Sequence, residues 1–170
     1  GVGTGTMRHP DERITVDVGI GVTQTARDIS LELADDLDRD AVKAKIDAGA
    51  TRAITQFFFD NDVYFRYLEK VHARGITIPI VPGIVPVQNF KQTASFAKKT
   101  GASVPQWLAE RFEGLDNDPA TRRLIAAAVA AEQVLALVDE GICNFHFYTM
   151  NKADLVYAIC HLLGLRAKAA

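Results

Sequence analysis

A chain of 170 residues that is 48% hydrophobic and 24% charged is long enough for one domain with a core of its own. Its formal net charge of -2 gives no support for a nucleic-acid or polyanion partner. No stretch approaches the roughly 20 apolar residues of a membrane span, no signal peptide is visible, and the two cysteines form no disulfide framework. We therefore expect a cytoplasmic protein with no membrane partner.

The first 37 residues are expected to contain one strand. Residues 1–13 are rich in glycine and polar side chains and are expected to be loose. Apolar residues then alternate with polar residues or glycine over residues 14–22, which is the period of a strand. Residues 23–37 are interpreted as a loop, because acidic residues interrupt their leucines. A helix is predicted to follow, from about Asp38 to Ala48.

The most informative stretch is Ala-Ile-Thr-Gln-Phe-Phe-Phe at residues 53–59. A nearly continuous apolar run is typical of a parallel strand that is covered on both faces. Gln56 interrupts it, and a buried amide without partners costs about 1–3 kcal/mol. Gln56 therefore has either a fixed protein partner or a ligand. Its place in the C-terminal half of the strand favours a ligand, because α/β folds bind ligands at that end.

The rest of the chain alternates strands with helices. Strands are predicted at 78–83 and 143–148, and helices at about 60–75, 88–101, 104–112, 117–141 and 152–163. This alternation predicts an α/β fold with parallel strands. A complete eight-stranded barrel needs about 250 residues, so we expect a partial (β/α)8 TIM-type barrel of about four units. The strands 14–22 and 143–148 would then be its open edges, which predicts a homo-oligomer or a partner chain.

Polar and aromatic side chains collect near the predicted C-terminal ends of the strands. They are Gln56, Asp60, Gln92, His146, Tyr148 and Asn151. Amides can read the edge of a planar heteroaromatic ring while aromatic side chains stack on its face, so such a ligand is expected. His146 lies between two phenylalanines and is more often structural than catalytic, and both roles remain open. No metal-ligand spacing and no glycine-rich phosphate motif is present.

Four motifs carry a resemblance to a known family. They are the stretch from Asp47 to Asp60, Val81-Pro-Gly-Ile-Val-Pro-Val-Gln-Asn-Phe-Lys91, Arg111-Phe-Glu-Gly-Leu-Asp116 and Phe145-His-Phe-Tyr-Thr-Met-Asn151. In order and spacing, residues 38–165 resemble the C-terminal half of the bacterial methylenetetrahydrofolate reductases. The resemblance implies the last four units of a flavin-containing barrel. It also implies that residues 38–170 form this half-barrel and residues 1–37 a divergent segment.

The activity implied is the reduction of 5,10-methylenetetrahydrofolate to 5-methyltetrahydrofolate, with FAD as cofactor and NADH or NADPH as reductant, in one-carbon metabolism and methionine biosynthesis. By resemblance, Gln56 corresponds to a pterin-contacting glutamine, Gln92 to a second substrate-contacting glutamine, and Phe96 to an aromatic that stacks on folate or nicotinamide. Tyr148 corresponds to a substrate-side tyrosine. Lys152 stands where the family usually has an arginine.

On the cofactor side, Asp38 and Lys45 correspond to residues that hold the ribityl and phosphate portion of FAD. Ala41 and Ala44 stand where the family usually has asparagine and arginine, which removes two further contacts. The family's catalytic glutamate, a general acid, and its first four strands have no counterpart in this sequence. Two hypotheses follow: a reductase or its C-terminal half, and a non-catalytic half-barrel that acts as a binding or assembly module.

Overall fold

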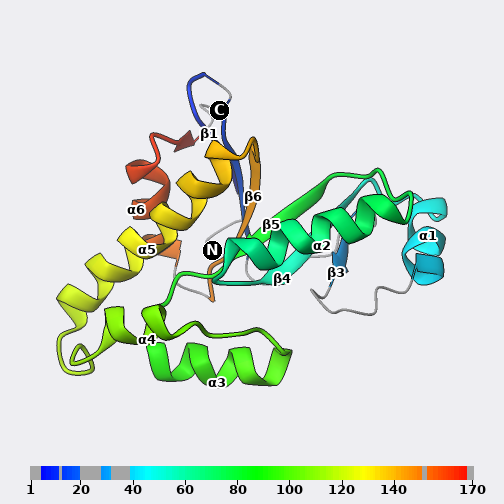
Figure 1. The fold of residues 1–170 in the computed structure, drawn as a ribbon. Coiled ribbons are helices and arrows are strands. Elements are labelled where there is room, and N and C mark those ends of the chain that lie inside the picture. Colours follow the sequence, from blue (N-terminus) through cyan, green and yellow to red (C-terminus); the bar gives the residue numbers. More distant parts are fainter. Residues whose placement is uncertain (1–4, 12, 20–27, 32–38, 151–152, 168–170) are drawn as a thin grey trace.

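The computed structural model describes residues 5–11, 13–19, 28–31, 39–150 and 153–167, which form a mixed α/β fold (Figure 1). Its strands are β1 (Gly5–Arg8), β2 (Thr15–Gly19), β3 (Asp28–Leu31), β4 (Arg52–Phe57), β5 (Ile80–Ile84), β6 (Asn144–Tyr148) and β7 (Arg166–Ala167). Its helices are α1 (Arg39–Asp47), α2 (Asn61–Ala73), α3 (Phe90–Thr100), α4 (Gln106–Phe112), α5 (Pro119–Asp139) and α6 (Ala153–Leu162). The helices predicted from the sequence are confirmed to within a few residues.

The described strands form one sheet in the order β3-β4-β5-β6-β2-β1-β7. The strands from β3 to β2 in this order are parallel, and β1 runs antiparallel to both β2 and β7. The predicted α/β class with a parallel sheet is therefore confirmed. None of the described helices is long and apolar enough to cross a membrane.

The prediction that strands 14–22 and 143–148 are open edges is wrong, because these two strands pair with each other. β2 and β6 run parallel in a register from Thr15 opposite Asn144 to Gly19 opposite Tyr148. The pairing buries Val16 against the core, where it is fully inaccessible. Residues 20–22 of the predicted strand lie outside the described residues.

Two strands in the N-terminal segment were not predicted. β1 lies in the stretch expected to be loose, and its pairing with β2 buries Met7. β3 lies in the stretch interpreted as a loop and pairs in parallel with β4. In both cases, a run of only four residues is too short to show a clear period in the sequence.

The helix starts follow from local capping chemistry. Asp60 accepts a hydrogen bond from the backbone N–H of Asp62 at the start of α2, and Asn89 accepts one from that of Gln92 in α3. Asp118 caps α5, with Pro119 in the first helical turn as predicted. These caps fix where each helix leaves its strand or loop.

The sheet has one apolar face and one polar face. Helices α2, α5 and α6 lie side by side over the face that buries Val16, Phe145 and Phe147, while α3 and α4 lie together below the sheet in Figure 1. The opposite face carries Asp17 and His146, which are paired in the β2–β6 register. Side chains that alternate along a strand point to opposite faces, which accounts for this division.

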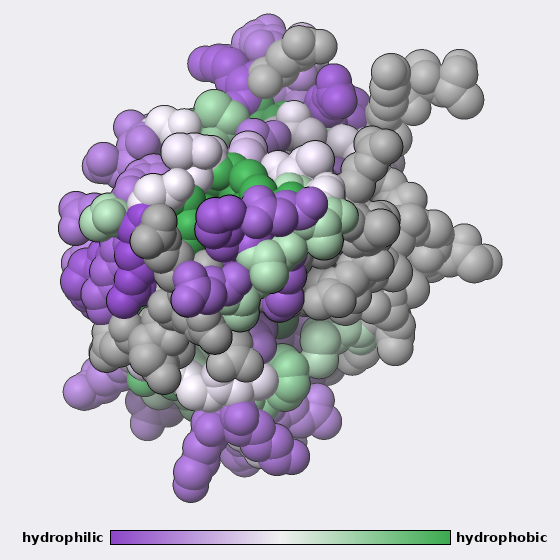
Figure 2. Space-filling view, turned by 90° about the vertical axis from the view of Figure 1, so that its right-hand side faces the viewer, coloured by the Kyte–Doolittle hydropathy of each residue, from purple (hydrophilic) through white to green (hydrophobic). Residues whose placement is uncertain are grey.

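The polar face is concave. Asp17 on β2 forms an ion pair with Arg52 on β4, although β5 and β6 lie between the two strands. In a flat sheet, three strand spacings would separate their backbones by about 14 Å, too far for these side chains to meet. The sheet must therefore curl around this face. On the side of the molecule that carries α1 and α2, apolar surface framed by hydrophilic side chains is visible (Figure 2).

Candidate functional site

A small open cleft lies where β5 leads into α3, and we call it the α3 cleft. It has a volume of about 110 Å³ and is lined by Val85, Pro86, Gln88, Asn89, Gln92, Thr93, Phe96 and Met150. The cleft forms between two elements that local interactions hold in place. All residues of β5 are buried, which fixes the strand, and the Asn89 cap fixes the start of α3. The cleft thus brings together two of the predicted site residues, Gln92 and Phe96.

Phe96 supplies the aromatic wall of this cleft. Its ring stacks on that of Phe57 from β4, with centroids 5.4 Å apart and planes at 19°. The side chain of Phe96 nevertheless remains 38% exposed. An aromatic ring that is held in place on one side and open on the other can accept a second ring by stacking.

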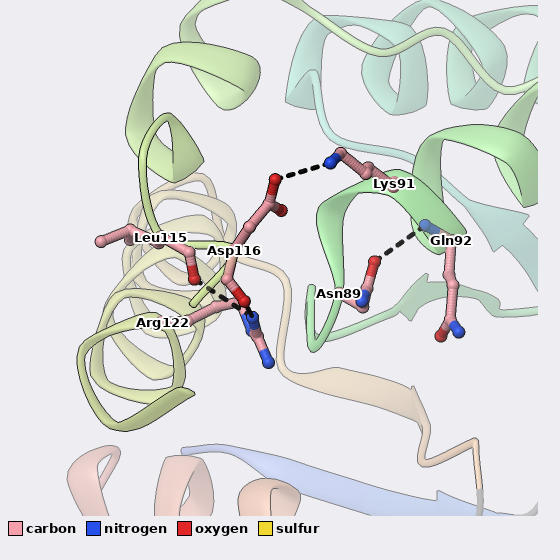
Figure 3. Close-up of polar contacts among 6 residues, drawn as sticks. All are labelled: Asn89, Lys91, Gln92, Leu115, Asp116 and Arg122. Atoms are coloured by element: carbon pink, nitrogen blue, oxygen red, sulfur yellow. Dashed lines mark hydrogen bonds and ion pairs between the residues drawn. The ribbon is translucent and has the colours of Figure 1, made fainter. Parts of the chain in front are cut away.

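Two glutamines supply the polar part of the α3 cleft. The backbone N–H of Gln92 donates to Asn89 Oδ1 at 3.1 Å, and the Gln92 side-chain amide points away from that turn (Figure 3). The Gln88 side-chain amide donates to the backbone carbonyl of Thr149 at 3.4 Å, which ties the cleft to the end of β6. The amide of Gln92 is therefore placed to hydrogen-bond a ligand that stacks on Phe96.

Gln56 is not among the residues that line this cleft. It is half-buried in β4, where the β4–β5 register shifts between Ile54 and Phe57. Its Oε1 accepts a hydrogen bond from the neighbouring backbone N–H of Phe57 at 3.2 Å. The next residue on β4, Phe57, carries the stacked Phe96 ring, so Gln56 is linked to the α3 cleft through the backbone.

Tyr148 lies on the concave face and is turned inward. Its hydroxyl donates to the backbone carbonyl of Thr55 at 2.9 Å, and its side chain is buried. Burial raises the pKa of Tyr148 to about 12. The His146 ring packs edge-on against it at a centroid distance of 4.8 Å, and His146 is itself buried. Tyr148 therefore holds β6 to β4 in this structure, and its predicted role toward substrate stays a prediction.

Among the predicted cofactor residues, the structure places only Lys45, which is exposed on α1. Ala41 and Ala44 are exposed on the same helix. The other cofactor residue, Asp38, and the predicted substrate residue Lys152 lie outside the described residues.

Sequence reasoning missed a second cleft, which we call the arginine cleft. It has a volume of about 160 Å³ and is lined by Gln88, Pro119, Arg122, Arg123, Asp154 and Leu155. One signal was visible in the sequence, because two consecutive arginines in the first turns of a helix place cations at the end where the helix dipole does not favour them. Gln88 belongs to both clefts, so the two adjoin.

The side chains that line the α3 cleft can bind a ligand, but none of them can act as a general acid or base. Its lining residues carry amide, hydroxyl, thioether, aromatic and aliphatic groups, and none of them is a carboxylate, an imidazole or an amine. Among the described residues, no group of three or more His, Cys, Asp or Glu side chains could hold a metal ion. Both cysteines are free, with Cys143 exposed and Cys160 buried. The cleft can bind and orient a planar ligand.

Comparisons with known proteins agree on one family. A family model described as methylenetetrahydrofolate reductase matches residues 22–164. The 5,10-methylenetetrahydrofolate reductase of Pectobacterium carotovorum subsp. carotovorum is 54% identical over 129 residues, covering 76% of this chain and 43% of the relative. That of Salmonella typhimurium is 52% identical over 125 residues, covering 74% and 42%. The chain thus spans about two fifths of the length of these relatives.

One solved structure has a similar fold. It is an uncharacterized protein from Clostridium thermocellum, described as binding two copies of 5-methyl-5,6,7,8-tetrahydrofolic acid. Its TM-score is 0.51 at 17% sequence identity, and the match covers 81% of this chain and 52% of that chain. At this identity the likeness concerns the fold.

Proposed function

Because the chain belongs to the methylenetetrahydrofolate reductase family, we propose that it binds a reduced folate at the α3 cleft and forms the folate side of a methylenetetrahydrofolate reductase. The reaction is the reduction of 5,10-methylenetetrahydrofolate to 5-methyltetrahydrofolate. The observation that supports this most strongly is the half-exposed Phe96 ring, which is fixed by stacking on Phe57 and bordered by Gln92. Such a site suits a planar heteroaromatic ring with polar edges.

In this proposal, each of the predicted substrate residues makes a different contact with the folate. Gln56 reads the edge of the pterin, Phe96 stacks on the ligand, and Gln92 bonds its polar groups. Lys152 adds a positive charge toward the substrate, and Tyr148 lies on the substrate side of β6. The folate ligand of the Clostridium thermocellum protein, which has a similar fold, is of the same chemical class.

We also propose that residues 38–170 correspond to the C-terminal half of a (β/α)8 TIM-type barrel, with residues 1–37 as a divergent segment. The parallel order β3-β4-β5-β6 and the curvature marked by the Asp17–Arg52 ion pair support this proposal. In a closed barrel the first and last strands pair in parallel, and β2 pairs with β6 in that way. This pairing supports the proposal that β2 stands in for a first barrel strand.

FAD, with NADH or NADPH as reductant, is the proposed cofactor system of the complete reductase, and the cytoplasm is its proposed location. The described residues of α1 fit a flavin poorly, however. Ala41 and Ala44 offer only methyl groups, and the exposed Lys45 is the one described cation among the predicted contacts. We therefore derive no step through the flavin from this chain.

The second candidate function is a non-catalytic half-barrel that binds folate or assembles with another chain. It is favoured by one specific observation, the lack of an ionisable side chain among the residues that line the α3 cleft. Where the half-barrel acts by binding folate, it shares that step with the reductase and differs from it in turnover, which can be measured separately.

Isothermal titration calorimetry of the purified chain with 5-methyltetrahydrofolate tests the shared step. We expect saturable binding that Gln92→Ala weakens by about fivefold to a hundredfold, the equivalent of about 1–3 kcal/mol. Phe96→Ala is expected to weaken it as well through lost stacking. Lys98→Ala, on the same helix but outside the cleft lining, is the matched control and should bind like the parent. Unchanged affinity in both cleft variants would refute the assignment of this site.

A further inference from the structure

Another cleft lies between the start of α2, helix α4 and the middle of α5, and we call it the tryptophan cleft. It has a volume of about 270 Å³, which is larger than that of the α3 cleft or the arginine cleft. It is lined by Phe59, Asp60, Asn61, Trp107, Val129, Glu132 and Gln133. None of these residues lines either of the other two clefts, so the proposed folate function leaves the tryptophan cleft without a role.

Two side-chain amides hold the walls of the tryptophan cleft together. Asn61 Nδ2, at the start of α2, donates to the backbone carbonyl of Gln133 on α5 at 3.3 Å. Gln133 Nε2 donates in return to the backbone carbonyl of Phe58 at 2.8 Å. The ring of Phe59 packs edge-on against that of Phe57 at a centroid distance of 5.7 Å. The chain itself therefore shapes the cleft.

One polar atom of a lining side chain is buried and unpaired. It is Asn61 Oδ1, which forms no hydrogen bond with the described residues. The Asn61 amide cannot be turned over, because its Nδ2 donates to a carbonyl, and the reverse orientation would place two acceptors against each other. A buried acceptor without a donor is unfavourable. A ligand group that donates an N–H to Asn61 Oδ1 removes this cost.

The charge of the tryptophan cleft is negative. The Asp60 carboxylate uses Oδ1 to accept the backbone N–H of Asp62, and its Oδ2 has no partner among the described residues. Glu132, the other lining carboxylate, is paired with Arg111 at 3.1 Å. None of the described lining residues is a cation. The cleft therefore repels an anion and attracts a cation, with Asp60 as the available countercharge.

Trp107 supplies a surface that recognises cations. Its side chain lines the cleft from α4 and is 41% exposed. The face of an indole ring attracts ammonium and guanidinium groups that lie over it. A guanidinium is planar and carries five N–H donors, so it can stack on the indole and still donate to Asn61 Oδ1 and Asp60 Oδ2.

We propose that the tryptophan cleft binds an organic cation, a guanidinium or ammonium group on a short alkyl chain. Trp107 stacks on the cation, Asp60 balances its charge, and Asn61 Oδ1 accepts one of its N–H groups. The volume of the cleft is close to the lower end of the range of about 300–1,000 Å³ for small-molecule sites, which suits a ligand of this size. The site is independent of the proposed folate function.

The test uses the fluorescence of Trp107, because this residue is the only tryptophan of the chain. The parent chain is titrated with butylguanidinium chloride and, separately, with butylurea, which has the same shape and no charge. Butylguanidinium should change the fluorescence in a saturable way, with half-saturation at about 1 mM or below. It should bind about ten times more tightly than butylurea, and about 0.5 M salt should weaken its binding.

Three variants, with folding checked by circular dichroism, test the assignment of this site by isothermal titration calorimetry. Asp60→Asn removes the charge, keeps a side-chain oxygen to cap α2, and should weaken butylguanidinium binding about tenfold. Trp107→Leu keeps an apolar side chain and should weaken it about threefold or more. Asp139→Asn removes the same charge from the end of α5, outside the cleft lining, and should bind like the parent.

A free small molecule and a basic side chain of a second copy of this chain share the proposed chemistry. The same butylguanidinium affinity at about 1 and about 50 μM protein would identify a free small molecule as the occupant. An affinity that falls as the protein concentration rises would identify a basic side chain of the second copy. Parental affinity in both cleft variants, equal binding of the two probes, or no saturable change would overturn the cation site.

Discussion

The hydroxyl of Tyr148 on β6 donates a hydrogen bond to the backbone carbonyl of Thr55 on β4, 2.9 Å away, across the intervening strand β5. Two strand spacings amount to about 9.6 Å, which the long tyrosine side chain and its hydrogen bond span by lying across β5. The tyrosine ring crosses β5 at Gly83. A Cβ atom there would lie 2.4 Å from the Thr55 carbonyl oxygen and 2.6 Å from Tyr148 Cε2.

We therefore expect Gly83→Ala to destabilise the fold. The added methyl group meets a backbone oxygen that cannot rotate away, and such overpacking costs about 1–3 kcal/mol. Urea denaturation followed by circular dichroism should show a lower midpoint with an unchanged slope. A variant with the parental midpoint would show that β5 can shift away from Tyr148 at no cost.

Stability should fall steeply at high pH because of buried tyrosines. Burial raises the pKa of Tyr148 to about 12, and the same cause raises that of Tyr64 to about 12. The unfolded side chains ionise near pH 10, so their contribution is complete below pH 10 and is lost as the pH rises toward 12. Each should lower the free energy of unfolding by up to about 1.4 kcal/mol per pH unit in that window.

The variant Tyr148→Phe isolates one of these contributions. It lacks the ionising group, so its free energy of unfolding should decline less steeply between pH 10 and 12 than that of the parent. The matched control is Tyr157→Phe, since the Tyr157 side chain is 56% exposed, and its decline should follow the parent. Equal slopes for all three proteins would contradict a buried, neutral Tyr148.

Most of the fold followed from local signals in the sequence. The caps at Asp60, Asn89 and Asp118 act within a few residues, and the structure places helices α2, α3 and α5 where these caps predict them. The four-residue strands β1 and β3 could not be predicted, because they exist through pairing with β2 and β4. The pairing of β2 with β6 could not be predicted either, because it joins two strands that are far apart in the sequence.

The candidate site was predictable only in part. Gln92 was expected at the mouth of the sheet, and Phe96 was expected by resemblance to stack on a ligand; both line the α3 cleft. The inward turn of Tyr148 depends on the space above Gly83, and that neighbourhood does not show in the sequence. Arg122 lies at the cleft because Leu115 and Asp116 bind its guanidinium, a tertiary arrangement that spacing along α5 does not reveal.

Gln56→Ala should separate a ligand role from a structural one. The Gln56 side chain accepts one hydrogen bond from its own neighbour Phe57 and is half-buried, so its loss should cost little stability. Binding of 5-methyltetrahydrofolate should weaken by about 1–3 kcal/mol, because polar groups of the pterin are left unpaired. Calorimetric titration and urea denaturation of the same preparation measure both. A loss of stability at parental affinity would assign Gln56 to the core.

Assembly should occur through the β3 end of the sheet. β3 is the terminal strand there and pairs with β4 among the described residues, so its other edge offers backbone groups for pairing. Figure 2 shows apolar surface on the side of the molecule that carries α1 and α2. We expect a homo-oligomer, or a complex with a chain that supplies further strands, at micromolar concentration in light scattering. A monodisperse monomer would contradict this expectation.

The final prediction is that this chain, alone with FAD, NADH or NADPH and 5,10-methylenetetrahydrofolate, does not turn over. Opening the five-membered ring of the substrate needs a proton donor, and no lining residue of the α3 cleft is ionisable. Glu110 and Glu113 are exposed on and just after α4, and Glu110 is bonded to Gln106, so neither reaches the cleft.

Loss of a general acid typically costs about 10²–10⁴ in rate, and the poor fit of α1 to a flavin removes the hydride carrier as well. Nicotinamide absorbance should stay constant over time, while calorimetry on the same sample shows that the folate still binds. Binding is the essential control, because it separates a silent site from an unfolded chain. Production of 5-methyltetrahydrofolate at about 1 s⁻¹ or faster would show instead that the chain assembles a complete active site from its own residues.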